Sequence, residues 1–363
     1  MHSHKKKPLY IRVLLNSLLV VLSMLFTLLL CEWAVRIILP QDKMVTWLEM
    51  HEEGFMMNQI NGNSFQELDT RIANYTFTKQ RLRATEKGRT TEKRILAIGD
   101  SFTFGLLLDE ENTYIHHLNQ EFLDSGNDST FILNGGVGGA GLADWPLWLE
   151  TFGDNIQPDK VLYFLNVHDI DRALSKNLFV LKNDSLIQSK RWKPQQFMFS
   201  LGKKGWYRWL QAHSQLANIV VKVLWKNVYF DDVTNNFDAK KSSTIIPNYD
   251  EFSLESNYST ELGMALIERM QNWCASNNCE LIVTTTGFFE QNKSDTHTAK
   301  FYNSILTNGL AYELPFYDNS PCVDSLASHN LDGIRIPGDS HPNEEGSSII
   351  AECTWQWLPS VLE

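Results

Sequence analysis

The chain starts with one long apolar run and then alternates short apolar runs with segments of helical periodicity. Residues 13–31 carry no charge, and this length suits a helix that crosses a membrane. Beyond them, apolar residues recur at helical spacing, as at Tyr114, Leu118 and Phe122. Five short apolar runs are typical of buried strands, at 94–98, 130–133, 160–165, 279–285 and 315–318. Strands that alternate with helices predict an α/β fold, with a five-stranded parallel sheet flanked by helices.

The flanks of the long apolar run predict how the chain is placed in a membrane. Four basic residues lie within residues 1–12, and no Ala-x-Ala cleavage site closes the run. Leu30 precedes Cys31, where a lipoprotein signal would have a small residue. We therefore expect a retained anchor over 13–31 rather than a cleaved signal peptide. Because basic flanks stay inside, the tail should be cytoplasmic and the rest of the chain periplasmic, with one pass through the inner membrane.

Two further segments differ from the α/β pattern. Residues 37–92 lack a clean period and are expected to form a membrane-proximal lead-in. Residues 172–258 interrupt the alternation of strands and helices. This insertion would either cap a site with its large apolar side chains or, as is more common for aromatic residues, pack onto the sheet. The side chains in question are Trp206, Trp209, Leu216, Ile219, Val220 and Trp225.

The charge of the chain limits its partners. Five of the 32 basic residues and one of the 43 acidic residues lie before residue 37, which leaves 27 against 42 and a net charge of −15 after it. So acidic a domain is not expected to bind nucleic acid or an anionic lipid surface. Neutral acyl esters or glycans suit it better as substrates.

The first segment with candidate chemistry follows the apolar run that ends at Ile98. Gly99, Asp100 and Ser101 come next, and a helical pattern follows them. A hydroxyl between a strand and the next helix lies at the carboxyl end of the sheet, where open α/β sheets bind ligands. By itself Gly-Asp-Ser is equally consistent with a plain turn, because all three residues favour turns.

Partners that a nucleophilic serine needs occur elsewhere in the chain. His341 lies just before a C-terminal apolar stretch, with Asp339 two residues upstream, and histidine shuttles protons near neutral pH. A glycine-rich loop, 134–141, follows the second strand and offers backbone N–H groups for an oxyanion. The third strand, near 160–165, leads into Asn166 and His168 at the same sheet edge.

These blocks, in this order, resemble the SGNH or GDSL family of serine esterases and acyltransferases. The resemblance covers about residues 93–358, which would be the catalytic domain, and it implies a flavodoxin-like sheet. It implies that Ser101 is the nucleophile, His341 the general base and Asp339 the orienting acid. The backbone N–H groups of Ser101 and Gly139 would form part of the oxyanion hole, with Asn134 and Gly139 matching the family's second block.

Two departures from the family pattern concern the same site. The third block is usually Gly-x-Asn-Asp, whose Asn donates to the oxyanion, but here His168 stands at that position. Either His168 donates through a ring N–H, or Asn166 takes the role as the fallback, or the oxyanion hole is incomplete. The acid commonly lies three residues before the histidine, where this chain has Gly338. Asp332, nine residues before His341, is the fallback acid.

The sequence thus predicts a membrane-anchored serine esterase or deacylase that acts through an acyl-enzyme on an ester of a carbohydrate or lipid. An O-acyltransferase that modifies a cell-envelope polysaccharide would use the same residues. A non-catalytic carbohydrate-binding protein is the third alternative, because of His168. No cofactor or metal is expected, since no ligand motif such as Cys-x-x-Cys occurs.

The cysteines outside the anchor are even in number, as in proteins of an oxidising compartment. Cys274 ends a predicted helix and Cys279 begins the next strand, so a bridge at that corner would leave Cys322 with Cys353. Free buried thiols are equally consistent with the pattern.

Overall fold

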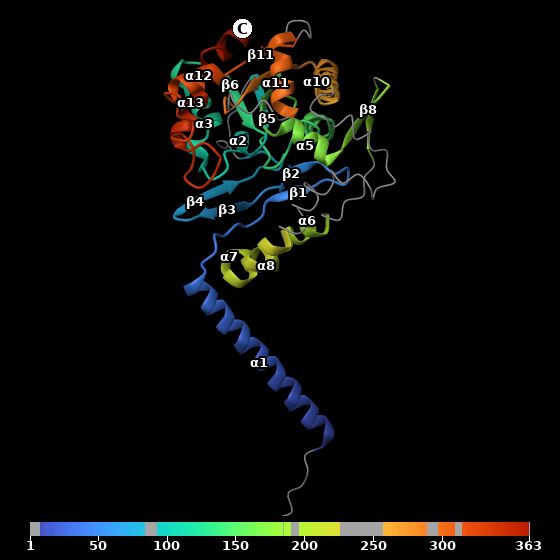
Figure 1. Ribbon diagram of the computed structural model, residues 1–363, viewed down its shortest axis with the longest axis vertical. Coiled ribbons are helices and arrows are strands. Elements are labelled where there is room, and N and C mark those ends of the chain that lie inside the picture. Colours follow the sequence, from blue (N-terminus) through green and yellow to red (C-terminus); the bar gives the residue numbers. More distant parts are fainter. Residues whose placement is uncertain are drawn as a thin grey trace, which may run out of the picture.

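A computed structural model describes residues 8–83, 93–183, 185–189, 196–225, 257–288, 297–308 and 314–362. Its N-terminal helix, α1 (Leu9–Ile38), extends away from the folded domain (Figure 1). None of its residues is buried, and by length and composition it could cross a membrane. The predicted apolar helix is confirmed, and it continues past residue 31 to Ile38.

The domain is built on a parallel sheet of five strands, as predicted. In chain order the strands are β5 (Lys93–Gly99), β6 (Thr130–Asn134), β7 (Lys160–Leu165), β10 (Glu280–Thr285) and β11 (Phe316–Tyr317). Their spatial order is β11-β10-β7-β5-β6, and every neighbouring pair is parallel. Numbered along the chain, this is the flavodoxin-like order 2-1-3-4-5.

Helices cover both faces of the sheet because successive strand residues point to opposite sides. Ile95 and Ala97 of β5 belong to the core with α3 (Tyr114–Asp124), α12 (Ser320–Leu326) and α13 (Glu344–Trp355). Leu96 and Ile98 face the opposite core. That core contains α4 (Asp144–Phe152), α5 (Asp169–Lys176), α10 (Tyr258–Ser276) and α11 (His297–Asn308).

The lead-in, 37–92, is more ordered than the sequence indicates. It forms two antiparallel hairpins, β1 (Leu48–Met50) with β2 (Met56–Asn58) and β3 (Asn63–Leu68) with β4 (Arg71–Thr76). Trp47 and Tyr75 pack on Phe104, the last residue of the short helix that begins at Ser101. Contacts with the domain therefore help to define these strands.

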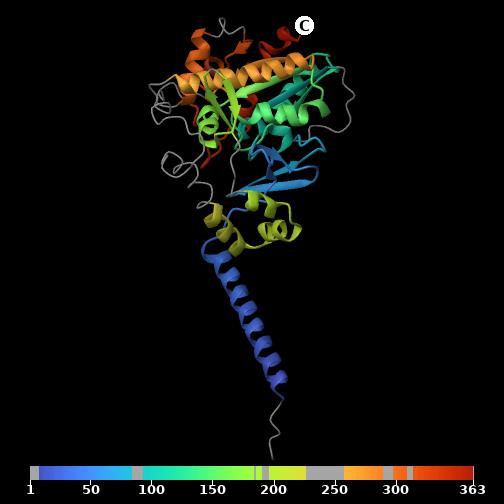
Figure 2. The same ribbon diagram turned by 90° about the vertical axis from the view of Figure 1, so that its right-hand side faces the viewer.

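The insertion forms a hairpin, β8 (Phe179–Lys182) with β9 (Ser185–Gln188), and three helices, α6 (Gln196–Gly202), α7 (Gly205–His213) and α8 (Gln215–Trp225). The three helices lie between α1 and the lead-in hairpins (Figures 1 and 2). Trp206 and Trp209 are each 60% exposed, so packing onto the sheet is wrong for these two. The side chain of Trp225 and all of residues 226–256 lie outside the described part of the chain.

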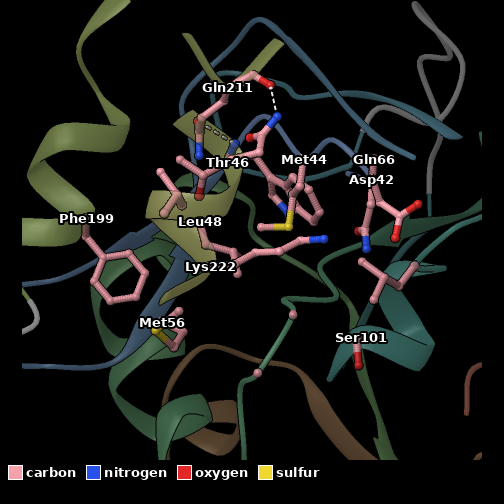
Figure 3. Close-up of a pocket in the computed structure, with 16 residues that line it drawn as sticks. Asp42, Met44, Thr46, Leu48, Met56, Gln66, Ser101, Phe199, Gln211 and Lys222 are labelled. Carbon is pink, nitrogen blue, oxygen red and sulfur yellow. Dashed lines mark hydrogen bonds between the residues drawn. The ribbon is translucent and has the colours of Figure 1, made fainter. Parts of the chain in front are cut away.

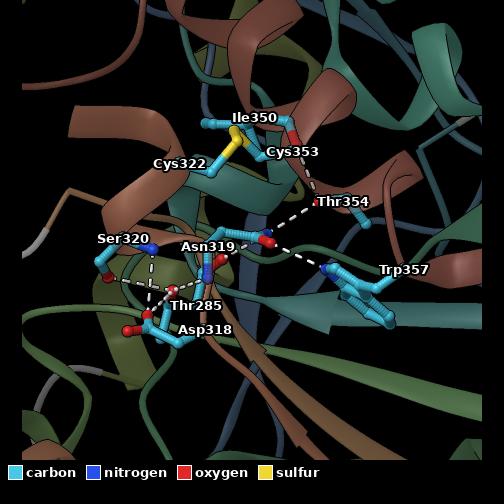
Figure 4. Close-up of a disulfide and its surroundings, with 9 residues drawn as sticks. All are labelled: Thr285, Asp318, Asn319, Ser320, Cys322, Ile350, Cys353, Thr354 and Trp357. Atoms are coloured by element: carbon cyan, nitrogen blue, oxygen red, sulfur yellow. Dashed lines mark hydrogen bonds between the residues drawn. A yellow bond between two sulfur atoms is a disulfide. The ribbon is translucent and has the colours of Figure 1, made fainter. Parts of the chain in front are cut away.

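A disulfide closes the C-terminal corner of the domain (Figure 4). Cys322 of α12 is bonded to Cys353 of α13, with 5.7 Å between their Cα atoms. Beside it, the amide of Asn319 donates to the carbonyl of Thr285 at the end of β10, at 3.0 Å. Cys274 and Cys279, both in the described part of the chain, are not bonded to each other. The bridge between Cys322 and Cys353 is thus present, and Cys274 and Cys279 follow the free-thiol alternative.

The remaining described elements are short. Helix α2 (Ser101–Phe104) begins at the predicted nucleophile. Three 3-10 helices are η1 (Glu110–Asn112), η2 (Gly153–Asn155) and η6 (Leu358–Val361).

Candidate active site

The turn after β5 places Ser101 at the carboxyl edge of the sheet. Gly99 ends the strand, and a Cβ there would lie 2.1 Å from Oγ1 of Thr103, so the turn can be this tight only with glycine. The side chain of Asp100 caps α2 by accepting from the N–H of Phe102 at 2.9 Å. Ser101 is the first residue of that helix, as the sequence predicts for a serine between a strand and a helix.

Ser101, His341 and Asp339 meet although 240 residues separate the serine from the histidine. Nε2 of His341 lies 2.7 Å from Oγ of Ser101. Nδ1 of the same ring contacts Oδ1 of Asp339, which also accepts from the backbone N–H of His341 at 2.9 Å. This is the chain of contacts that a base-activated serine requires.

The loop that carries the acid and the base is held as a closed turn. The N–H of Ile336 donates to the carbonyl of His341, and the N–H of Asp339 donates to that of Ile336, each at 2.9 Å. Gly338 has a φ of +80°, in the left-handed region that favours glycine. This turn favours glycine at position 338, and Asp339 takes the position next to the ring.

The surroundings of Asp339 favour its charged form. Burial raises the pKa of its carboxyl group, but the hydrogen bonds and charge of His341 outweigh burial and bring the pKa below its ordinary value. Asp332, the fallback acid, has a side chain that is 93% exposed and lies 3.9 Å from Arg335. The hydrogen-bonded partner of His341 is thus Asp339.

The third block lies directly behind the nucleophile. Nδ2 of Asn166 donates to Oδ1 of Asp100 at 2.9 Å, and the Asn166 side chain is fully buried. His168 is exposed and is the residue at the N-cap of α5. An amide nitrogen has two N–H donors, so Asn166 keeps one after binding Asp100. Asn166 is thus held behind the turn of Ser101 while His168 reaches the surface, and the role of either residue as the side-chain donor stays a prediction.

A buried charge cluster supports this arrangement, and the sequence did not reveal it. Nη1 of Arg172 donates to Oδ2 of Asp100 at 2.6 Å and lies 3.8 Å from Asp169. Burial, and then the charge of Asp100, raise the pKa of Asp169 to about 8. Arg172 follows Asp169 by three residues on one helix face, a spacing that could have indicated the pair.

The glycine-rich loop runs alongside the end of β5. The N–H of Gly135 donates to the carbonyl of Ala97 at 2.8 Å, and the N–H of Val137 donates to that of Gly99 at 3.0 Å. Gly139 has a φ of +72°, and its carbonyl accepts from Nζ of Lys176 at 2.8 Å. Lys176 is itself paired with buried Asp144 at 2.7 Å. The predicted oxyanion loop is therefore fixed next to the Ser101 turn.

Arg83 is a second residue without a sequence signal. Its side chain is buried, and it lies over the rings of Tyr75 and Phe104. Nη1 donates to the carbonyl of Gly105 at 2.7 Å, just after helix α2. A single arginine in an aperiodic segment matches no motif, yet here it fastens the backbone that follows the nucleophile.

Ser101 opens into a pocket with a volume of about 540 Å³ (Figure 3). Gly138 and Gly139 line it beside the serine. The opposite walls come from the lead-in hairpins and from α6, α7 and α8. The insertion therefore covers the site, as the cap interpretation expects, but Trp206 and Trp209 are not among the residues that line it. The residues that do so are Phe199, Gln211, Asn218, Val221 and Lys222.

Among known proteins, solved structures of similar overall fold resemble this chain. No family model and no curated protein matches the chain. Solved structures that resemble it include a G-D-S-L family protein from Desulfitobacterium hafniense, with 13% identity and a TM-score of 0.40 over 73% of this chain and 99% of that one. The psychrotrophic esterase EstA from Pseudoalteromonas has 11% identity and a TM-score of 0.42, over 75% of this chain and 99% of that one. The acetylxylan esterase Axe2 from Geobacillus stearothermophilus has 12% identity and a TM-score of 0.42, over 73% of this chain and 94% of that one.

Proposed function

We propose that this protein is a membrane-anchored serine esterase or deacylase of the SGNH type. The observation that carries the proposal is the contact chain from Ser101 through His341 to Asp339 at the side of a covered pocket. Such a chain activates a hydroxyl by giving its proton a defined acceptor. The closed turn at 336–341 holds His341 and Asp339 in place, and the cap at Asp100 holds the helix start at Ser101.

The reaction follows from the positions of these atoms. Oγ of Ser101 attacks the carbonyl carbon of an ester while its proton moves to Nε2 of His341, and the carbonyl oxygen becomes an oxyanion. When this intermediate collapses, the carbon–oxygen bond to the alcohol breaks, and the alcohol takes the proton from His341. Water then attacks the acyl-enzyme, again with His341 as base, and releases the acid and Ser101.

The donors to the oxyanion are proposed to be the backbone N–H groups of Ser101 and Gly139 with one side-chain amide from the third block. Asn166→Ala should lower turnover by about 10²- to 10³-fold, the usual cost of losing one oxyanion donor. His168→Ala should have a smaller effect, because it is Asn166 whose amide is hydrogen-bonded to Asp100, next to the nucleophile. Turnover of a soluble ester by the two variants measures the difference. A loss at His168 with full activity at Asn166 would assign the donor to His168 instead.

Whether water or a sugar hydroxyl resolves the acyl-enzyme decides between a hydrolase and an O-acyltransferase. The purified protein should release free acid from an acyl ester at the same rate with and without an oligosaccharide acceptor. Acylated oligosaccharide formed at the expense of free acid would show a transferase. A parent protein inert toward every ester, in either condition, would favour the carbohydrate-binding alternative.

Anchoring is supported by the length and exposure of α1 and by the basic residues before it. A C-terminal alkaline phosphatase fusion should be active and a C-terminal green fluorescent protein fusion dark, because the domain would lie outside the cytoplasm. The reverse pattern would place the active site in the cytoplasm and contradict this topology.

A further inference from the structure

The pocket beside Ser101 is mainly apolar on the side away from the sheet. Leu48 of β1, Met56 of β2, Phe199 of α6 and Val221 of α8 contribute to its lining. Met56 and Phe199 are 2% and 3% exposed, so their side chains belong to the packed wall. Figure 3 shows Leu48, Phe199 and Met56 grouped together on one side of the pocket, with Ser101 on the other.

The pocket is larger, and has a larger apolar wall, than an acetyl group would fill. Pockets that enclose whole drug-sized ligands have volumes of about 300–1,000 Å³, and this one lies within that range at about 540 Å³. An acetyl group has a single methyl carbon beyond the carbonyl and would leave most of the apolar wall in contact with water. A longer hydrocarbon chain would cover the part of that wall that is still exposed, mainly at half-buried Leu48 and Val221, and this is favourable in proportion to the apolar area covered.

The apolar wall is also fixed to the end of α1. The carboxylate of Glu32, in α1, accepts from the backbone N–H groups of Gln215 and Leu216 at 2.9 Å each, at the start of α8. Farther along α8, Nζ of Lys222 donates to Oε1 of Gln41 at 3.2 Å, just after α1 ends. Helix α8 therefore forms the pocket wall on one side and packs against the candidate membrane helix on another.

We infer that this pocket binds the acyl chain of a medium- or long-chain ester, with the carbonyl at Ser101 and the chain along Leu48, Met56, Phe199 and Val221. The inference rests on the proposed function of Ser101 and names the substrate class of that site. The chain could belong to a lipid of the membrane next to α1 or to a soluble acyl ester, and the shared chemistry is the hydrocarbon chain.

The first test compares esters of different length with the full-length protein in detergent. The kcat/KM for p-nitrophenyl octanoate should exceed that for p-nitrophenyl acetate at least tenfold, since each buried methylene is worth up to about fourfold. Val221→Trp should lower this ratio at least tenfold by filling the pocket. Val220→Trp is the matched control, because Val220 is the adjacent residue of α8 and is 50% exposed, and it should leave the ratio unchanged.

The outcomes separate this inference from the proposed function. Hydrolysis of acetate at least as fast as octanoate would overturn the acyl-chain site while the esterase stands. Equal ratios for the two tryptophan variants would overturn it as well. Hydrolysis of neither ester would overturn both proposals.

A second test needs neither turnover nor the tryptophan variants. Full-length Ser101→Ala should bind 11-dansylaminoundecanoic acid saturably, and decanoate should displace the probe whereas acetate should not. Lack of saturable binding would contradict the inference. With the parent protein in vesicles of phosphatidylethanolamine and phosphatidylglycerol, release of fatty acid would identify a membrane lipid as the source. Intact vesicle lipids alongside rapid octanoate hydrolysis would identify a soluble ester, and either result supports the acyl-chain site.

Discussion

Ser101→Ala should lower kcat for a soluble p-nitrophenyl ester by about 10⁶-fold, and His341→Ala should do the same. The hydroxyl and the ring lie 2.7 Å apart and act as one unit, so either residue alone is ineffective. For the same reason the double variant should be no worse than either single variant, because effects within one catalytic unit do not add. Steady-state rates of the three variants measure this.

Ser340 provides the matched control for these variants. It lies between Asp339 and His341 in the same loop, and its side chain is exposed. Ser340→Ala keeps the backbone of the loop and should retain the parent rate. If Ser340→Ala is inactive while Ser101→Ala retains activity, the nucleophile has been misassigned.

Asp339→Asn should lower kcat by about 10⁴-fold without unfolding the domain. An amide at this position can donate to Nδ1 of His341, which would hold the ring in the tautomer that cannot accept the proton of Ser101. The lowered pKa of Asp339 keeps its carboxylate charged down to pH values below those at which an ordinary aspartate is protonated. Kinetics together with a thermal melt separate lost chemistry from lost structure.

Asp332→Asn is the companion variant for the acid. The side chain of Asp332 is 93% exposed and lies near Arg335 rather than near the ring of His341, so the variant should turn over substrate at the parent's rate. An exchange of the two effects, with Asp332→Asn inactive and Asp339→Asn active, would make Asp332 the orienting acid.

The sheet could be predicted because a buried parallel strand can be identified from its own consecutive apolar residues. The run from Ile95 to Ile98 is apolar throughout, since helices cover both of its faces. The positions of Ser101 and His341 could be predicted from short motifs, because the backbone conformation of each motif restricts which residues can occupy it. Examples are the close approach of Thr103 to the backbone at Gly99 and the left-handed conformation of Gly338.

The rest of the site depends on contacts between distant residues, which leave no local pattern. The hairpins of the lead-in are held by Trp47 and Tyr75, which pack on Phe104, and strands β1 and β2 have only three residues each, too few to show a period. The pocket combines Leu48 with Val221, residues from the lead-in and from the insertion. Cys274 and Cys279 lie at a predicted helix-to-strand corner, but spacing alone could not determine whether they form a bond.

The central claim is that Ser101 is a nucleophile activated by His341. Labelling the full-length protein with an organophosphonate serine probe, followed by peptide mapping, tests it most directly. We expect a single modified residue, Ser101, and no labelling of Ser101→Ala or His341→Ala, because an unactivated hydroxyl reacts too slowly. Labelling that persists in Ser101→Ala, or that maps to Ser340, would contradict the account.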